Sequence, residues 1–298
     1  MTKKSKWTFK EVSRNVHCID ICLPKSGDEQ WVLLQTDAHW DNPMCDRSKM
    51  KKHLDLALQR NAPVIDAGDF FCAMQGKYDK RSGKKDLRSE HATGNYLDSL
   101  IDTAVKWLAP YKSILTIRGN GNHESAIQKN HETDLTERLA ERLRSIGGIA
   151  RRGGYSGFVK FSVCKRVFNG TRSCSKIFKL WYFHGSGGGG PVTRGVIQTN
   201  RQAVYVADAD FVFTGHTHDS WQMPIERIRL NNLNSIETFR QTHIKGAGYK
   251  EEFQDGYGGW HVERGMSPRP TGAYWIRFFN NGYKNKDVEY EYEIIEAK

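Results

Sequence analysis

Two histidines separated by one residue follow an apolar run in the second half of the chain. His216 and His218 come directly after residues 211–215, a run that ends in Gly215. In an extended segment, residues i and i+2 project from the same face, so both imidazoles can enter one site. Neutral imidazole nitrogens are common ligands of divalent transition metals. The spacing therefore predicts a metal site, and the alternative is a pair of surface histidines at a turn.

Four further blocks of polar residues follow apolar segments in the same way. In chain order they are Asp37 and His39, then Asp69, then Asn122, His123 and Glu124, and finally His184. Each block alone is weak, because a single histidine such as His184 is usually a hydrogen-bonded structural residue. Open α/β folds place their sites at the carboxyl ends of strands, so the five blocks together predict one shared site. Asn120 is a rival to Asn122, but only Asn122 is followed by His and Glu.

The segments that carry these blocks have the patterns of strands and amphipathic helices. Strands are predicted at 31–36, 63–67, 113–118, 158–163, 176–183 and 211–214, with further ones at 273–279 and 289–295. Helices are predicted from Lys49 to Arg60, Tyr96 to Leu108, Thr133 to Ile146 and about Thr199 to Val206. A turn at 24–28 predicts a hairpin joining 16–23 to 31–36. Strand, helix and strand in succession indicate an α/β fold.

The sequence contains no internal repeat and no Pro/Ser-rich linker, so we expect a single domain over residues 1–298. From about residue 219 we expect this domain to be β-rich, in short strands and loops.

Taken in order, the five blocks resemble the motifs of the calcineurin-like metallophosphoesterase superfamily. That series is D-x-H, G-D, G-N-H-[DE], H and G-H-x-H, and each block has a counterpart between residues 31 and 218. The resemblance implies a four-layer α-β-β-α sandwich of two mixed sheets, with a dinuclear metal site at the C-terminal ends of the strands. It implies one ion held by Asp37, His39, Asp69 and His218, and another held by Asp69, Asn122, His184 and His216. Asp69 would bridge the ions, and His123 would be catalytic, acting on the leaving group or on the developing charge.

The ligand types suit this chemistry. A shared carboxylate offsets the repulsion of two cations about 3.5–4 Å apart, and a water between them becomes a nucleophile near neutral pH. Neutral Asn122 supplies an oxygen without adding negative charge to a site that accepts phosphate. Mixed His, Asp and Asn ligands favour transition metals over calcium. We expect two divalent ions, with manganese as the first choice and iron, zinc, nickel, cobalt or magnesium as alternatives.

The sequence departs from the motifs of related proteins at two places, and the first argues against one branch of the superfamily. Residues 70–72 read Phe-Phe-Cys, where protein Ser/Thr phosphatases of this superfamily carry Asp-Arg-Gly after the G-D block, which argues against that branch. Trp40 stands where some relatives have glycine, and packing is favoured over base stacking for it. Asp41 is a candidate partner for the His39 ring, because metal-bound imidazoles usually donate to a carboxylate or a carbonyl.

A polar and basic excursion at 72–92 follows Asp69 and should lie near the mouth of the site. Its residues suited to binding phosphate are Lys77, Tyr78, Arg81, Arg88 and His91. We predict that they form a substrate-binding lid, and the alternative is a solvated charged loop. Replacing Lys77 and Arg81 by alanine should then raise KM for the true substrate.

The charge balance favours polyanionic partners. Lys and Arg outnumber Asp and Glu by 45 to 34, a net charge of +11, and a further basic cluster lies on a predicted hairpin at 165–176. DNA or RNA is therefore a candidate substrate, although no known nucleic-acid-binding module is present.

No signal peptide or apolar run of ~20 residues is present, so we expect a location in the cytoplasm, or in that of a host, and no membrane partner. The sequence does not identify protein partners. Six cysteines in 298 residues indicate free thiols, with a Cys164–Cys174 disulfide as the alternative.

We predict a dinuclear metal-dependent phosphoesterase, a phosphoric ester hydrolase in which a metal-bridging hydroxide attacks a phosphate ester in line. Within that class we favour a phosphodiesterase or nuclease acting on nucleic acid or nucleotides. The alternative enzymes are a small-molecule phosphomonoesterase and a nucleotide pyrophosphatase. A different class of alternative is a non-catalytic metal-binding scaffold for protein interactions. Loss of a metal ligand or of His123 would favour the scaffold, and none of these residues is lost.

Overall fold

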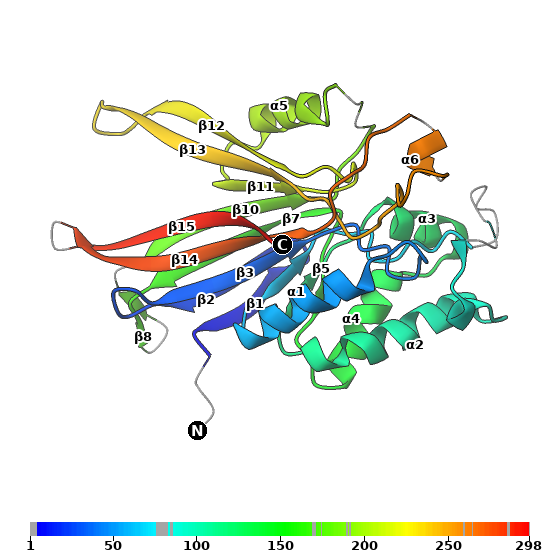
Figure 1. Ribbon diagram of the computed structural model, residues 1–298. Coiled ribbons are helices and arrows are strands. Elements are labelled where there is room, and N and C mark those ends of the chain that lie inside the picture. The colour runs from blue at the N-terminus through cyan, green and yellow to red at the C-terminus, as the bar shows by residue number, and fades with distance from the viewer. Residues whose placement is uncertain are drawn as a thin grey trace.

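Two mixed β-sheets form the centre of the protein (Figure 1). The computed structural model describes residues 5–75, 83, 86–168, 171–173, 175–188, 190, 192–258, 260–263, 265–284 and 287–297. The seven-stranded sheet has the order β1 (Trp7–Ser13), β2 (Val16–Cys22), β7 (Ser156–Cys164), β10 (Lys176–Phe183), β11 (Phe211–Thr214), β13 (Ile236–Lys245) and β12 (Trp221–Leu230). The six-stranded sheet has the order β15 (Asp287–Ala297), β14 (Ala273–Lys284), β3 (Glu29–Gln35), β4 (Val64–Asp66), β5 (Leu115–Arg118) and β6 (Arg151–Arg152). The predicted α/β class with two mixed sheets is confirmed.

The two sheets pack against each other through aromatic side chains. Phe278 on β14 lies with its ring centroid 5.0 Å from Phe161, 5.2 Å from Phe178 and 6.3 Å from Phe211, all three on the seven-stranded sheet. These side chains are buried and belong to one core cluster that also contains Ile276 and Leu33. Burial of apolar surface between the sheets is therefore the main force that holds them together.

Helices lie on the outer sides of the sheets. The helices are α1 (Arg47–Gln59), α2 (Tyr96–Leu108), α3 (Asn122–His131), α4 (Leu135–Ser145), α5 (Val196–Tyr205) and α6 (Trp260–Glu263), with single 3-10 turns at Ser89–His91 and Ala109–Tyr111. Figure 1 shows α1, α2 and α4 together on one side and α5 on the opposite side. Side-chain caps begin two of them, since Asp46 accepts from the Lys49 N–H and Asp134 accepts from the Glu137 N–H. No helix among the described residues combines the length and the apolar character that crossing a membrane requires.

Two predicted features of the fold are wrong, and one helix was not predicted. The strands at 16–22 and 29–35 do not form a hairpin, because β2 pairs with β1 and β7 whereas β3 pairs with β14 and β4. The turn between them instead carries the chain from one sheet to the other. Residues beyond 219 contain a hairpin of two ten-residue strands, β12 and β13, rather than only short strands. Helix α3 was not predicted, although it begins at Asn122 inside the G-N-H-E block.

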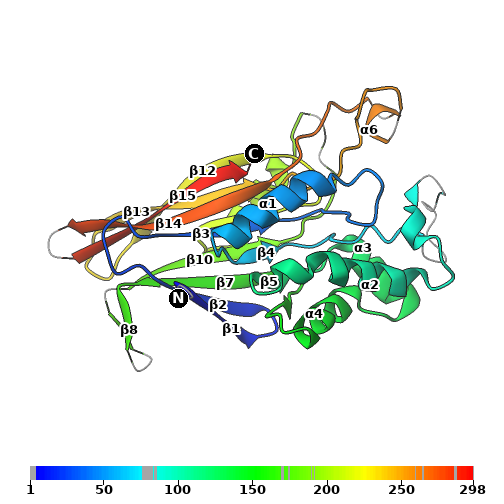
Figure 2. The same ribbon diagram turned by 60° about the horizontal axis from the view of Figure 1, so that its bottom comes forward.

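Parallel pairing brings the predicted polar blocks to one edge of the molecule. Strands β3, β4 and β5 are parallel neighbours in one sheet, and β10 and β11 are parallel neighbours in the other. Their carboxyl ends therefore point the same way within each sheet. The short β8–β9 hairpin (Arg166–Phe168 and Thr171–Ser173), which carries the predicted basic cluster, lies at the opposite end of the molecule from α3 and α6 in both views (Figures 1 and 2).

Candidate metal centre

Two groups of potential metal ligands lie where strand ends from both sheets meet. In each group, one ligand atom per residue lies within 4.8 Å of the others: the first group is Asp37, His39 and His218, and the second group is Asp69, His184 and His216. The seventh predicted ligand, Asn122, joins the second group, because its Oδ1 lies 3.1 Å from His184 Nε2. The structure thus brings together all the residues predicted to bind metal. It places Asp69 in the second group, and its role as a bridge stays a prediction.

The first group contains buried polar atoms that lack partners. Asp37 Oδ2 accepts hydrogen bonds from the Thr36 hydroxyl at 2.6 Å and the His216 backbone N–H at 2.8 Å, while Oδ1 lies 3.6 Å from His218 Nε2 and 4.0 Å from His39 Nε2. Asp37 Oδ1 and both ring nitrogens of His39 are buried without a hydrogen-bond partner in the described part of the chain. Burial raises the pKa of Asp37 to about 6 and lowers that of His39 well below its usual value. Such atoms are costly to bury. A cation would satisfy Asp37 Oδ1 and one His39 nitrogen, while the other nitrogen of the neutral ring carries a proton.

The second group is centred on His184, whose two ring nitrogens both face oxygen atoms. Nδ1 lies 3.2 Å from the Ala67 carbonyl oxygen, and Nε2 lies 3.1 Å from both Asp69 Oδ2 and Asn122 Oδ1. Burial opposes the imidazolium, but the Asp69 and Asp37 carboxylates outweigh it and raise the pKa of His184 to about 9. A metal ion at Nε2 would supply positive charge to the same oxygens in place of that proton, so this group also fits a cation.

His123 lies beside both groups. Its ring centroid is 4.8 Å from that of His39, and its Nε2 is 3.9 Å from Asp69 Oδ2. Its Nδ1 lies 2.5 Å from the carbonyl oxygen of Cys72. Because a carbonyl only accepts, Nδ1 carries a proton, and Nε2 is the nitrogen turned toward the site.

Glu124 holds the loop after β4 against the start of α3. Its Oε2 accepts from the backbone N–H groups of Asp69 at 3.1 Å and Gly121 at 2.9 Å, and its Oε1 accepts from Phe71 at 2.8 Å. Burial and the nearby Asp69 carboxylate raise the pKa of Glu124, whereas the backbone N–H donors favour its carboxylate form. The sequence block contains Glu124, but it gave no indication of this positioning role.

Most of the ligand residues have a strained backbone. The φ angles are 49° for Asp37, 45° for His39, 51° for Asp69, 73° for His216 and 53° for His218. Residues other than glycine rarely adopt this left-handed region, which costs on the order of 1–3 kcal/mol each. Such conformations cluster at functional sites, where the surrounding structure holds them in place.

Two glycines allow the backbone to approach the carboxylates closely. A Cβ atom on Gly121 would lie 2.0 Å from Asp69 Oδ1, and one on Gly215 would lie 2.2 Å from Asp37 Oδ2. No side chain fits at either position. The glycines of the G-N-H-E and G-H-x-H blocks are therefore required by packing against the ligand residues themselves.

The site opens into a cavity of about 880 Å³. His39, His123, His216 and His218 line one part of it, and a C-terminal segment that the sequence did not indicate lines another, through Lys250, Glu252, Tyr257, His261 and Met266. Lys250 pairs with Glu252, whose Oε2 lies 3.5 Å from His261 Nε2. The left-handed backbone of Gly248 (φ 82°) lets the chain pass directly against Asp37, but in the sequence it is one of 28 glycines and gave no signal of this wall.

The structure decides three choices that the sequence left open. Asn120 accepts a hydrogen bond from Thr136 and donates one to Ser125, so Asn122 is the asparagine at the site. Trp40 is buried and stacks on Phe70 at 6.1 Å, which confirms packing. The predicted Asp41–His39 contact is wrong: Asp41 accepts from the Cys72 and Ala73 N–H groups and from the Tyr96 hydroxyl.

The two described residues of the predicted lid do not face the cavity. Arg88 donates to the backbone carbonyls of Asn42, Pro43 and Cys45, so its guanidinium holds that loop rather than a phosphate. His91 is 1% exposed, with Nδ1 3.3 Å from the Ser99 hydroxyl. These contacts use or bury the donors of both side chains and give no support to a substrate role, which stays a prediction. Lys77, Tyr78, Arg81 and Cys174 lie outside the described residues, so the rest of the lid and the Cys164–Cys174 pairing stay predictions.

Comparisons with known proteins add little to this geometry. No protein-family model matches the chain, and no curated protein matches it. Among solved structures, a predicted phosphoesterase from Streptococcus pneumoniae aligns over 90% of this chain and 98% of its own, at 10% identity and a TM-score of 0.28. Chaetomium thermophilum Vps29, solved with a cyclic peptide, aligns over 90% of this chain and 97% of its own, at 9% identity and a TM-score of 0.27. At such low scores we base the functional assignment on the site itself.

Proposed function

We propose that this chain is a metal-dependent phosphoric ester hydrolase, a single α-β-β-α sandwich domain whose two ligand groups each hold a divalent cation. The single observation that carries this is the meeting of both groups, built from five strand ends, with His123 beside them. The unpartnered atoms around Asp37 and the oxygens around His184 support a cation in each group. Bound divalent ions, with manganese as the first choice, would supply Lewis-acid activation of water and of a phosphoryl oxygen.

The chain's own residues then have distinct roles. Glu124 fixes the backbone of Asp69 between the sheets, and Asn122 adds a neutral oxygen beside His184. The Cys72 carbonyl orients His123 so that Nε2 faces the cavity, where it holds a proton for the leaving group or stabilises developing charge. The low exposure of His39 and Asp69 keeps water away from all but the cavity side.

An activity panel with Mn²⁺ tests this function. A generic phosphodiester, a generic phosphomonoester, single- and double-stranded DNA, and RNA would each be assayed with and without a chelator. Asp69→Asn should lose at least about 100-fold in activity, since even partners of metal ligands are worth 10–100-fold. The exposed Asp102 on α2 offers a matched control, Asp102→Asn, which should remain active. Absence of metal-dependent turnover on every ester would contradict the assignment, and preference for the monoester would favour a phosphomonoesterase.

Within this class we favour a phosphodiester of nucleic acid or nucleotides as substrate. The cavity of about 880 Å³ is large enough for a nucleotide, since ligand pockets typically have ~300–1,000 Å³. Tyr257 lines it and is 96% exposed, and Met44, Met74 and Met266 add apolar surface. An exposed aromatic ring is a stacking platform for a base, and the net charge of +11 favours a polyanion.

Substitution of Tyr257 separates this substrate class from small esters. Base stacking is worth about 1–3 kcal/mol, so Tyr257→Ala should raise KM for a dinucleotide or single-stranded DNA by about tenfold. KM for a small generic phosphodiester should be unchanged. Tyr205→Ala, at an exposed tyrosine on α5 outside the cavity lining, is the matched control. Equal effects on both kinds of substrate would count against a base-stacking role.

A further inference from the structure

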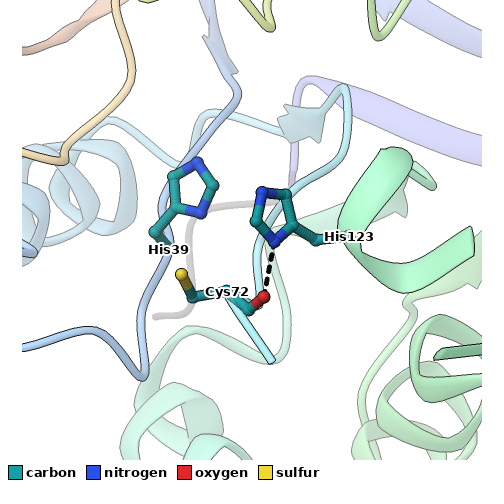
Figure 3. A group of neighbouring side chains, drawn as sticks. All are labelled: His39, Cys72 and His123. Carbon is teal, nitrogen blue, oxygen red and sulfur yellow. Dashed lines mark hydrogen bonds between the residues drawn. The ribbon is translucent and has the colours of Figure 1, made fainter. Parts of the chain in front are cut away.

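Cys72 forms a third group of potential metal ligands that uses neither Asp37 nor Asp69. One ligand atom each of His39, Cys72 and His123 lies within 4.8 Å of the others, and all three residues are buried (Figure 3). Figure 3 shows the sulfur turned toward the His39 ring, with the His123 ring beside both. His39 is 2% exposed, and both of its ring nitrogens lack a hydrogen-bond partner among the residues that the structure describes.

The residue types select a different kind of cation from the other two groups. Two imidazoles and a thiolate suit a thiophilic ion such as Zn²⁺, whereas the carboxylate-containing groups also suit Mn²⁺ or Mg²⁺. Burial raises the pKa of the Cys72 thiol to about 12, and the Asn42 side-chain amide, which donates to the sulfur at 3.4 Å, opposes this only in part. The thiol is therefore protonated until a bound cation displaces its proton. His39 and His123 line the cavity, which provides an entry path and an open fourth coordination position. Tetrahedral zinc places its nitrogen and sulfur ligands ~3.3–3.8 Å apart, so ligand atoms that lie within 4.8 Å of one another need to approach by at most about 1–1.5 Å.

We propose that His39, Cys72 and His123 form an inhibitory site for a thiophilic divalent cation, with Zn²⁺ as the probe. As the metal–sulfur bond forms, the thiol proton leaves to solvent. The effect on catalysis rests on the proposed function: coordination withdraws His123 from the leaving group and engages His39 away from Asp37. Zn²⁺ in excess of the activating ions then suppresses hydrolysis instead of supporting it.

Cobalt absorption spectroscopy tests the site without requiring catalysis. A thiolate bound to Co²⁺ gives a near-ultraviolet charge-transfer band, which neither carboxylate-containing group can produce. The band should appear in the unmodified protein and in Cys45→Ser, whose thiol is also buried but lies outside the three groups. It should be lost in both Cys72→Ser and Cys72→Ala, with circular dichroism confirming that each variant is folded. A band that persists in the folded Cys72 variants, or is absent from the unmodified protein, would overturn the site.

Inhibition assays with Zn²⁺ test whether a cation bound at Cys72 suppresses hydrolysis. With Mn²⁺ supporting hydrolysis, the Zn²⁺ concentration for half-inhibition should rise at least about tenfold in Cys72→Ser, in line with the value of one metal-site interaction. Cys45→Ser should be inhibited like the unmodified protein. Equal sensitivity of Cys72→Ser would show that Zn²⁺ inhibits elsewhere. If no ester is hydrolysed under any condition, the proposed function fails while the cobalt band still decides whether the site exists.

Discussion

The Glu124 carboxylate accepts a hydrogen bond from the backbone N–H of Asp69 at 3.1 Å, across 55 residues of sequence. The same carboxylate accepts from Gly121 and Phe71, so one buried side chain fixes both the loop after β4 and the start of α3. Asp69 is therefore placed by a residue that does not itself belong to either ligand group. The left-handed backbone of Asp69 needs such support, because the conformation is unfavourable without it.

Glu124→Gln should weaken both stability and metal binding. The amide keeps one acceptor oxygen but turns an N–H₂ donor toward a backbone donor, so about 1–3 kcal/mol of unfolding free energy should be lost. Affinity for Mn²⁺ should fall about 10–100-fold, as expected for a residue that orients a ligand. Urea unfolding and calorimetric metal titration measure the two effects. Glu141→Gln, at an exposed position on α4, should change neither; unchanged metal affinity in Glu124→Gln would remove the positioning role.

The two histidines of the G-H-x-H block should serve different ions. His218 belongs with Asp37 and His39, and His216 with Asp69 and His184. His218→Ala should therefore empty the first group before the second, and His216→Ala the second before the first. Anomalous diffraction from crystals grown at limiting Mn²⁺ would count the ions, with His131→Ala at the end of α3 as the control. Loss of the same ion in both variants would contradict this division.

His123→Ala should slow hydrolysis without removing metal. Its Nδ1 is engaged by the Cys72 carbonyl, so its Nε2 acts on the substrate, and general acid catalysis is worth about 10²–10⁴-fold. An ester with a nitrophenolate leaving group needs no proton, so it should lose much less than one with an alkoxide leaving group. Equal losses on both esters would favour stabilisation of developing charge, and bound metal would be measured by inductively coupled plasma spectrometry. Marked loss of metal in His123→Ala would show that His123 is a ligand instead.

Metal affinity should rise with pH up to about 9. In protein stripped by a chelator, the pKa of His184 is raised to about 9, so its imidazole is protonated at neutral pH. A cation at Nε2 must displace this proton, and each pH unit below 9 therefore costs about tenfold in affinity. The dependence should level off above that pH. Calorimetry in buffers of different ionisation enthalpy would count the released proton, and an affinity independent of pH between 7 and 9 would contradict the imidazolium.

Sequence patterns could predict the ligands because each follows an apolar strand. Asp37, Asp69 and His184 all come just after buried runs, and parallel pairing within each sheet brings such strand ends together. The grouping into two sets came from the resemblance of these blocks to the motifs of a known family, not from the residues alone. Helix α3 was not predicted because Gly119 and Gly121 stand just before its first residue, and glycine has a low helix propensity.

Other features could not be predicted, because they depend on contacts distant in sequence. A polar turn such as 24–28 looks the same whether it closes a hairpin or crosses between sheets, so the partners of β2 and β3 were not determined locally. The C-terminal segment that lines the cavity through Tyr257 lies 220 residues after Asp37 (257 − 37), and nothing near Tyr257 in the sequence indicates a cavity. Cys72 gains its neighbours only when the loop after β4 folds beside His39 and His123.

Each ligand group takes residues from both sheets: the first from the ends of β3 and β11, and the second, with Asn122, from the ends of β4, β5, β10 and β11. A bound cation would therefore act as a cross-link that closes one end of the sandwich, while the aromatic contacts of Phe278 hold its interior. The free energy of cation binding then adds to the free energy that is needed to separate the two sheets. At a metal concentration 100 times Kd, each ion adds about 2.7 kcal/mol to the free energy of unfolding. The concentration of available metal would in this way set the stability of the domain as well as its activity.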